Sequence, residues 1–314
     1  MNFHENLDIY VNQINGLLDK TLDINAGYAD YLVDAMKYSV VGGGKRLRPL
    51  LMQECAKLFL QQADSSQGET DGNGAAVKLP AELPYFMAAI EFIHSYSLVH
   101  DDMPCLDNDE FRRGRKTTHA EYGEATALLA GDGLLNYAFE IASKAFSVTD
   151  DPAKCGRAMQ ILARQAGILG MIGGQAADVH VEKTGAEMNE DLLLFIHENK
   201  TAAMIESAMM IGACLAGADE KDLDKLSSIG SKIGLAFQIR DDILDIEGDF
   251  ETFGKPIGSD ETNGKLTYVS LYGLERSKDD VKKLSDEAIE GLKQFPSRNE
   301  FLEELVKYLI DRKK

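Results

Sequence analysis

Two clusters of aspartate in this sequence have the residue types and spacing of a divalent-metal site. One lies in the segment SYSLVHDDMPCLDNDEFRRGR (95–115) and the other in FQIRDDILDIEGD (237–249). The carboxylates concerned are Asp101, Asp102, Asp107, Asp241, Asp242 and Asp245. A site of carboxylate oxygens, without His or Cys, selects Mg²⁺ or Mn²⁺ and leaves room for water and substrate phosphates. Calcium is disfavoured because the loop pattern of an EF-hand is not present.

The spacing within each cluster brings its carboxylates together. Asp241 and Asp245 are four residues apart, so on a helix they share one face, where like charges repel by on the order of a few tenths of a kcal/mol. A bound cation would remove that repulsion. In the first cluster, Pro104 disfavours helix at the residue before it, so the helix should end or kink there and Asp107 can fold back towards Asp101.

A solvated helix face is the alternative explanation for such acids. One D-D-x-x-D pattern is unremarkable in a chain with 52 acidic residues. Two are harder to attribute to solvation, because each follows a strongly apolar segment, 88–99 or 233–239, and therefore lies near the end of a buried helix. We interpret the two clusters together as functional.

Basic residues gather in four short segments of this otherwise acidic chain. The segments are GGGKRLRP (42–49), FRRGRKTTH (111–119), HENKT (197–201) and FGKPIGSD (253–260). The first lacks the spacing and the Ser or Thr of a P-loop, but glycines leading into a helix N-terminus with bases still form an anion pocket. Any single base would more often be a solvated surface residue. Beside metal-binding acids, the bases together predict sites for two diphosphates, one held through metals and one by cations alone.

Composition restricts the class of protein. The net charge of −19 argues against nucleic-acid binding, which depends on a surplus of Lys and Arg. The four cysteines are widely spaced, so neither a zinc site nor a redox pair is indicated, and buried reduced thiols are expected. Residues 1–20 lack the apolar core of a signal peptide, and the apolar run 201–218 is typical of a buried helix, not a membrane span. We therefore expect a cytoplasmic protein without a membrane span.

Helical periodicity dominates the chain, and alternating strand patterns are nearly absent. The predicted helices lie near 4–20, 27–40, 46–62, 81–102, 121–146, 152–171, 189–216, 221–247, 266–293 and 298–312. Loops are indicated at 61–77, 149–152 and 253–265. These patterns predict an all-α protein in which residues 1–314 form a single large helical bundle with several helices buried on all sides.

The ordered set of motifs resembles the trans-type isoprenyl (polyprenyl) diphosphate synthases, in the bacterial farnesyl diphosphate synthase branch. The motifs are GGGKRLRP, EFIHSYSLVHDDMPCLDNDEFRRGRKTTH, GDGLL, GGQAAD, NKT, FQIRDDILD and GKPIGSDETNGKLTYVSL. In the first cluster four residues separate the Asp pair from the last Asp, which is the bacterial and plant form. The resemblance implies the isoprenoid synthase fold, a helical bundle around a central apolar cavity.

The resemblance also implies a role for each site residue. The six aspartates would bind Mg²⁺, three ions per active site, with Mn²⁺ as an alternative. The residues expected to contact the allylic diphosphate are Arg112, Lys200 and Lys255. Those expected to hold isopentenyl diphosphate are Lys45, Arg48, His94 and Arg113. Thr201 and Gln238 would lie close to the developing cation, and Lys200 counts with them among the catalytic residues.

The implied reaction joins isopentenyl diphosphate head-to-tail to dimethylallyl or geranyl diphosphate and gives farnesyl diphosphate. Diphosphate leaves only when its charge is neutralised, so metal ions with Lys and Arg would promote ionisation to an allylic cation. The double bond of isopentenyl diphosphate then attacks, and loss of a proton completes the condensation. Water must be excluded, because it would quench the cation.

Product length is expected to depend on the helix before Asp101. One isoprene unit spans about one helical turn, ~5 Å. Ser97 lies one turn before Asp101 and Tyr96 is its neighbour; in the family, an aromatic residue at that position forms a floor that favours a fifteen-carbon product. The alternative is that Tyr96 is an ordinary core residue with its hydroxyl paired.

Other functions remain open at this point. The same motifs fit a geranylgeranyl diphosphate synthase. A terpene cyclase shares the scaffold but needs only one diphosphate site, and a non-catalytic helical subunit would not need intact acids and bases. The family implies a homodimer, with apolar faces such as 125–138 available for its interface. The sequence does not determine the primer, product distribution, physiological metal or regulation.

Overall fold

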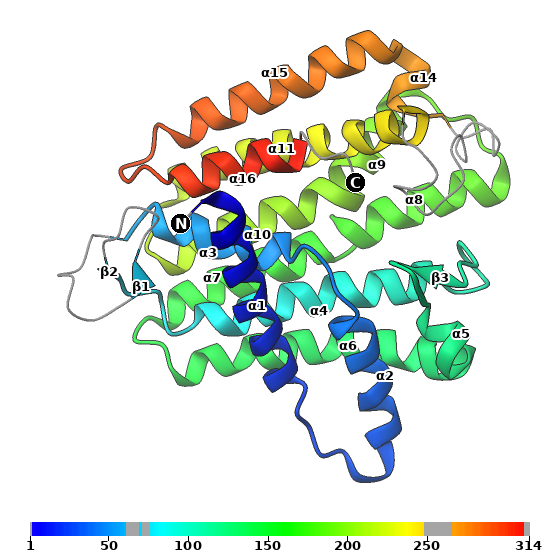
Figure 1. The fold of residues 1–314 in the computed structure, drawn as a ribbon, viewed down its shortest axis with the longest axis horizontal. Coiled ribbons are helices and arrows are strands. Elements are labelled where there is room, and N and C mark those ends of the chain that lie inside the picture. Colours follow the sequence, from blue (N-terminus) through cyan, green and yellow to red (C-terminus); the bar gives the residue numbers. More distant parts are fainter. Residues whose placement is uncertain (1, 61–68, 71–75, 248–265, 311–314) are drawn as a thin grey trace. The chain divides into compact units, whose positions relative to one another are not determined.

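The computed structural model describes residues 2–60, 69–70, 76–247 and 266–310, and these are almost entirely helical (Figure 1). The prediction of an all-α protein is therefore confirmed. Contacts between residues divide the chain into two compact units, one of residues 1–53 and 80–159 and one of residues 54–79 and 160–314. A single domain over residues 1–314 stays a prediction.

The first unit is built from helices and one short hairpin. Its elements are α1 (Phe3–Thr21), η1 (Gly27–Ala29), α2 (Asp30–Val41), the start of α3 (Leu47–Lys57), α4 (Leu83–Asp101), β3 (Phe111–Arg112), β4 (Arg115–Lys116), α5 (Thr118–Tyr122), α6 (Glu124–Lys144), η2 (Ala145–Ser147) and the start of α7 (Pro152–Ala166). Helix α4 packs against α6, and β3 pairs antiparallel with β4.

The second unit contains the ends of α3 and α7 and the remaining elements. These are β1 (Glu69–Thr70), β2 (Ala76–Val77), α8 (Met171–Thr184), α9 (Glu190–Ile196), η3 (His197–Ala202), α10 (Ala203–Leu215), α11 (Glu220–Glu247), α14 (Tyr268–Tyr272), α15 (Leu274–Leu292) and α16 (Glu300–Ile310). Helix α11 contacts α10, α15 and η3. The turn η3 is π-helical, a conformation that is often found at functional sites.

Two of the predicted helices are each interrupted by a glycine. The predicted helix 121–146 is broken at Gly123 between α5 and α6, and the predicted helix 266–293 is broken at Gly273 between α14 and α15. Both glycines have φ of 82°, which L-residues with side chains rarely adopt. Helix α8 has no counterpart among the predicted segments, because the glycine pair in its first turn weakens the helical pattern.

Buried helices form the cores of both units. Phe86, Ile90 and Phe92 of α4 are fully buried, so this helix is enclosed on all sides and carries the first aspartate cluster at its C-terminal end. Helix α10 is buried along nearly its whole length, which confirms the interpretation of 201–218 as a core helix. Among the described residues, none of the helices has the length and apolar character required to cross a membrane. Cys55, Cys155 and Cys214 are buried and Cys105 is exposed.

A buried ion pair fixes the loop that precedes α3. Arg46 has φ of 50° and is 3% exposed. Its guanidinium donates to Glu91 of α4 at 2.8 Å, to the Asn15 side chain at 2.8 Å and to the Val40 carbonyl at 2.6 Å. Three acceptors around one guanidinium indicate that Arg46 stabilises the fold of this unit.

Candidate active site

The first aspartate cluster lies where α4 ends and the chain turns back. The Asp107 N–H donates to the Asp101 carbonyl at 2.9 Å, and the Leu106 N–H donates to the Met103 carbonyl at 2.8 Å. Pro104 lies inside this turn. The prediction that the chain folds Asp107 back towards Asp101 is confirmed.

Asp102 is the buried member of this cluster and is paired with a predicted diphosphate ligand. Arg112 of β3 donates to one Asp102 oxygen through Nε at 2.8 Å and Nη2 at 2.7 Å. Burial raises the pKa of Asp102, although Arg112 opposes that rise. Burial lowers the pKa of Arg112, but the hydrogen bond and charge of Asp102 raise it overall. One pocket is lined by Asp102, Arg112 and Arg113, which brings together an acid and two bases that the sequence analysis selected.

Arg48, His94 and Arg113 form a cationic cluster in the same unit. Burial lowers the pKa of all three groups, and Arg113 lowers the pKa of both Arg48 and His94 further. Within the described residues the buried Nε of Arg48 has no hydrogen-bond partner. Arg48 and His94 are half-buried and Arg113 is exposed, and the charge of Glu91 raises the pKa of both arginines against the effect of burial. The positive charge gathered in this cluster favours the binding of an anion.

The glycine loop before α3 holds Arg113 in this cluster. The Arg113 guanidinium donates to the Gly43 carbonyl. Gly44 has φ of 144°, which residues with a side chain rarely adopt, and a Cβ there would lie 2.8 Å from Arg113 Nη1 and displace the end of that side chain. Lys45, the other predicted isopentenyl diphosphate ligand, follows this loop and is half-buried.

The predicted chain-length residues lie on α4 before the first cluster. Tyr96 is buried, and its ring packs edge-on against His100 with 5.8 Å between centroids. Burial raises the pKa of the Tyr96 hydroxyl to about 12, with a further contribution from Asp101. The Ser97 hydroxyl donates to the His94 carbonyl at 2.9 Å. Both residues therefore lie close in sequence and space to the cationic cluster and the first carboxylates.

The second aspartate cluster lies in the last turns of α11. Asp241 and Asp245 are half-buried and lie one helical turn apart, as predicted. Asp242 is buried, and its carboxylate accepts the Tyr268 N–H of α14 at 2.8 Å. The second aspartate of this pair is thus held by the segment that follows it, as Asp102 is held in the first cluster.

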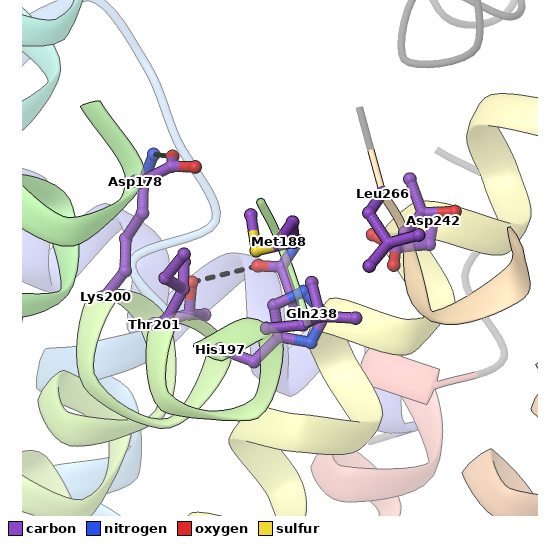
Figure 2. A pocket seen from close by; sticks show the side chains of 11 residues that line it. Asp178, Met188, His197, Lys200, Thr201, Gln238, Asp242 and Leu266 are labelled. Atoms are coloured by element: carbon purple, nitrogen blue, oxygen red, sulfur yellow. Dashed lines mark hydrogen bonds and ion pairs between the residues drawn. The ribbon is translucent and has the colours of Figure 1, made fainter. Parts of the chain in front are cut away.

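Lys200 and Thr201 lie in the π-helical turn η3, beside α11. Figure 2 shows the pocket that they line together with Gln238, Asp242 and Asp178. The Thr201 hydroxyl donates to Gln238 Oε1 at 2.9 Å, and Lys200 Nζ lies 2.7 Å from Asp178 Oδ2 of α8. Four of the predicted residues therefore line one pocket of the second unit.

Close packing between helices positions this π-helical turn. A Cβ on Gly174 of α8 would lie 2.3 Å from the backbone nitrogen of Lys200. A Cβ on Gly234 of α11 would lie 2.3 Å from the Ala202 Cβ. Both distances are shorter than atoms can approach, so each helix contacts η3 through a glycine. The backbone of Lys200 is held by α8 and that of Ala202 by α11.

We predict that Gly174→Ala lowers the free energy of unfolding by about 1–3 kcal/mol, because overpacking forces α8 or η3 to move. The displaced Lys200 and Thr201 should also lower kcat. Urea unfolding and steady-state kinetics measure the two effects. Gly156→Ala is the matched control, since a Cβ there meets nothing within 4 Å inside α7. Equal behaviour of the two variants would show that the close approach is unimportant.

Some of the candidate residues remain untested by these contacts. Lys255 lies outside the described residues.

In the described part of the chain, no three His, Cys, Asp or Glu side chains converge closely enough to hold a metal by themselves. The donors present are nonetheless all carboxylates, and Mg²⁺ commonly completes its coordination with water and substrate phosphates. The residues therefore fit Mg²⁺, and their roles as ligands stay predictions.

Asp178 and Tyr268 are site residues that the sequence analysis does not identify. Asp178 is the last residue of the motif GGQAAD. An acid four residues after a glycine pair is the sequence feature that could have identified it. Tyr268 contributes a backbone N–H, which no residue type in the sequence reveals.

The chain belongs to the polyprenyl synthetase family, which it matches over residues 29–309. Among its relatives, farnesyl diphosphate synthase of Escherichia coli is 38% identical over 322 aligned residues that cover the whole of both chains. Farnesyl diphosphate synthase of Geobacillus stearothermophilus is 44% identical over 79% of this chain and 77% of that protein. A solved structure of Helicobacter pylori geranyltransferase with magnesium and isoprenyl diphosphate matches with a TM-score of 0.77 and 34% identity, covering 98% of this chain and 96% of that one. The isoprenoid synthase fold expected from the sequence is confirmed.

Proposed function

We propose that this chain is a Mg²⁺-dependent prenyltransferase that condenses isopentenyl diphosphate with dimethylallyl and geranyl diphosphates to give farnesyl diphosphate. Its relatives named as farnesyl diphosphate synthases support this assignment. Geranylgeranyl diphosphate is the alternative product.

The observation that carries the proposal is the cationic cluster of Arg48, His94 and Arg113. The charges of Arg48 and Arg113 both lower the pKa of His94, so the three side chains lie near one another, and Arg113 also donates to the Gly43 carbonyl of the glycine loop. The carboxylate Asp102 and its partner Arg112 form a second, differently composed anion site in the same unit. A terpene cyclase needs one diphosphate site, whereas a condensing enzyme needs two. Two anion sites of different composition therefore favour condensation.

The aspartates of both clusters would hold the metal ions. When bound, Mg²⁺ supplies positive charge that stabilises the departing diphosphate. Lys200 adds a cationic donor to the same task, and Asp178 fixes its ammonium at 2.7 Å. An ammonium that is already oriented costs little reorganisation when charge develops on the leaving group.

Thr201 and Gln238 would stabilise the allylic cation. Because the Thr201 hydroxyl donates its proton to Gln238 Oε1, the Thr201 oxygen keeps its lone pairs for the pocket. An oxygen dipole with its negative end towards the substrate favours positive charge there. The double bond of isopentenyl diphosphate attacks the cation, and the proton lost afterwards passes to the released diphosphate.

The direct test is incubation of the purified chain with dimethylallyl and isopentenyl diphosphates and Mg²⁺, followed by product sizing. A fifteen-carbon diphosphate is the expected main product. Cyclised or hydrolysed products formed without isopentenyl diphosphate would identify a terpene cyclase. A complete lack of turnover would favour a non-catalytic subunit.

We predict that Tyr96→Ala lengthens the product to twenty carbons or more, because removal of the ring extends the space beyond the first cluster. Chromatography of the dephosphorylated products measures the change. Tyr96→Phe keeps the ring and loses only the hydroxyl, so it should keep the fifteen-carbon product. An unchanged distribution for Tyr96→Ala would show that the ring is not the floor.

We also propose that two copies of the chain form a homodimer through α6. The side chains of Leu128 and Leu129 on this helix are each 47% exposed, within the face 125–138. Light scattering measures the mass. Leu128→Glu should produce a monomer, and a wild-type monomer would contradict the proposal.

A further inference from the structure

The second unit contains a groove between α11, α15 and α16 that the reaction does not use. The three helices contact one another and lie side by side (Figure 1). The groove encloses about 450 Å³, compared with about 90 Å³ for the pocket of Lys200. A volume of this size is in the range of small-molecule sites, roughly 300–1,000 Å³.

The floor of the groove is apolar and comes from all three helices. It consists of Ile243 of α11, Val281 and Ile289 of α15, and Ile310 of α16. All four side chains are at least nine-tenths buried. The floor is therefore a rigid surface that can accept a short apolar chain.

The rim of the groove is basic, although the chain as a whole carries a net charge of −19. Arg240, Lys278, Lys282 and Lys307 line it, against the single carboxylate Asp286. Lys278 is neutralised by Glu247 at 2.7 Å and Glu275 at 3.3 Å.

Lys282 and Lys307 differ from Lys278 in their pairing. Within the described residues neither Lys282 nor Lys307 forms an ion pair, and both are exposed. Like charges gathered on one rim repel, and an anion bound between them would relieve that repulsion. The rim is therefore selective for a negatively charged group.

The groove lies behind the second aspartate cluster. Successive residues of a helix are about 100° apart, so Ile243 lies roughly 140–160° around α11 from Gln238 and Asp241, and Arg240 lies roughly 160° from Gln238 and about 100° from Asp241. A molecule in the groove would contact the helix that carries the catalytic carboxylates without touching those carboxylates.

We propose that this groove is a second ligand site for an amphiphilic anion, with a phosphate or carboxylate head and a short alkyl tail. The head contacts Lys282 and Lys307, and the tail lies on Ile243, Val281 and Ile310. Neither an inorganic anion nor a neutral amphiphile uses both surfaces, so each binds more weakly than a molecule that combines them.

Isothermal titration of the full chain with octyl phosphate and with decanoate tests the proposal. Saturating Mg²⁺ and inorganic diphosphate are added first to occupy the catalytic site. One molecule per chain should bind, at least tenfold more tightly than inorganic phosphate or octyl glucoside. Nonanoate, whose eight-carbon tail matches that of octyl phosphate, is titrated beside decanoate, and the tighter of octyl phosphate and nonanoate identifies the head group. Equal binding of octyl glucoside, or no binding, would overturn the proposal.

Variants locate the site. Lys282→Glu combined with Lys307→Glu should weaken binding about tenfold, because the anionic head loses two ion-pair partners and is repelled by two carboxylates. Lys283→Glu makes the charge change of one of these two substitutions at a position next to Lys282 but outside the groove, and should leave the affinity unchanged. Binding that survives the double variant but is lost in Arg48→Met would place the probe in the catalytic site and refute the proposal. Because the readout is binding without turnover, its result does not depend on the proposed reaction.

Discussion

Asp241→Asn is expected to lower kcat about 10²- to 10³-fold and to raise the Mg²⁺ concentration needed for half-maximal rate. The change removes one negative charge at nearly constant volume from a half-buried position on α11. Loss of one electrostatic contribution to charge stabilisation typically has this magnitude. Steady-state rates measured over a Mg²⁺ titration give both quantities.

The choice of Asp241 follows from the burial of its neighbour. Asp242 accepts the Tyr268 N–H, so its replacement would also disturb the contact between α11 and α14. Asp241→Asn should lower the unfolding temperature less than Asp242→Asn, because Asp241 is half-buried and Asp242 is buried. Asp279→Asn, on the exposed side of α15, is the control and should alter neither rate nor stability. If Asp241→Asn kept kcat within about threefold of the wild type, its assignment as a metal ligand would be wrong.

The two aspartate clusters share more than their spacing. In each, the second aspartate of the pair is buried and is held by the segment that follows, Asp102 by Arg112 and Asp242 by the Tyr268 N–H. Each cluster is followed by a five-residue helix, α5 or α14, that ends at a glycine with φ of 82°. The buried aspartate of each pair therefore connects its long helix to the segment that follows.

Local chemistry explains which parts of the site could be predicted from the sequence. Pro104 ends α4 and allows the fold-back to Asp101, and the four-residue spacing of Asp241 and Asp245 places them on one face; neither inference needs knowledge of distant residues. The apolar runs before both clusters likewise predict buried helices, because burial on all sides leaves no polar stripe in the sequence.

The parts that could not be predicted depend on contacts between elements. Asp178 faces Lys200 only because Gly174 allows α8 to approach η3. The sequence HENKT does not indicate the π-helical turn. A π-helical turn holds one more residue than an α-helical turn, and a five-residue segment is too short for that difference to alter the spacing of its apolar residues. Helix boundaries at Gly123 and Gly273 require a backbone conformation that the residue type permits but does not impose.

Arg46 and Arg48 are two residues apart, yet their replacement by Met should have opposite consequences. Arg46→Met leaves Glu91 buried without its partner, and Glu91 Oε2 already lacks a hydrogen bond within the described residues. Breaking a buried pair in this way costs about 3–5 kcal/mol, so the free energy of unfolding should fall by that amount. Urea unfolding measures it.

Arg48→Met should not destabilise the chain. Burial lowers the pKa of Arg48, which means that the folded state disfavours its charged form, and removal of that charge relieves the cost. The same variant should raise KM for isopentenyl diphosphate about 10- to 100-fold, because a hydrogen bond to a charged group contributes about 1.5–3 kcal/mol. KM for the allylic substrate should change little. A loss of stability in Arg48→Met with KM unchanged would show that the cationic cluster supports the fold and does not bind the second diphosphate.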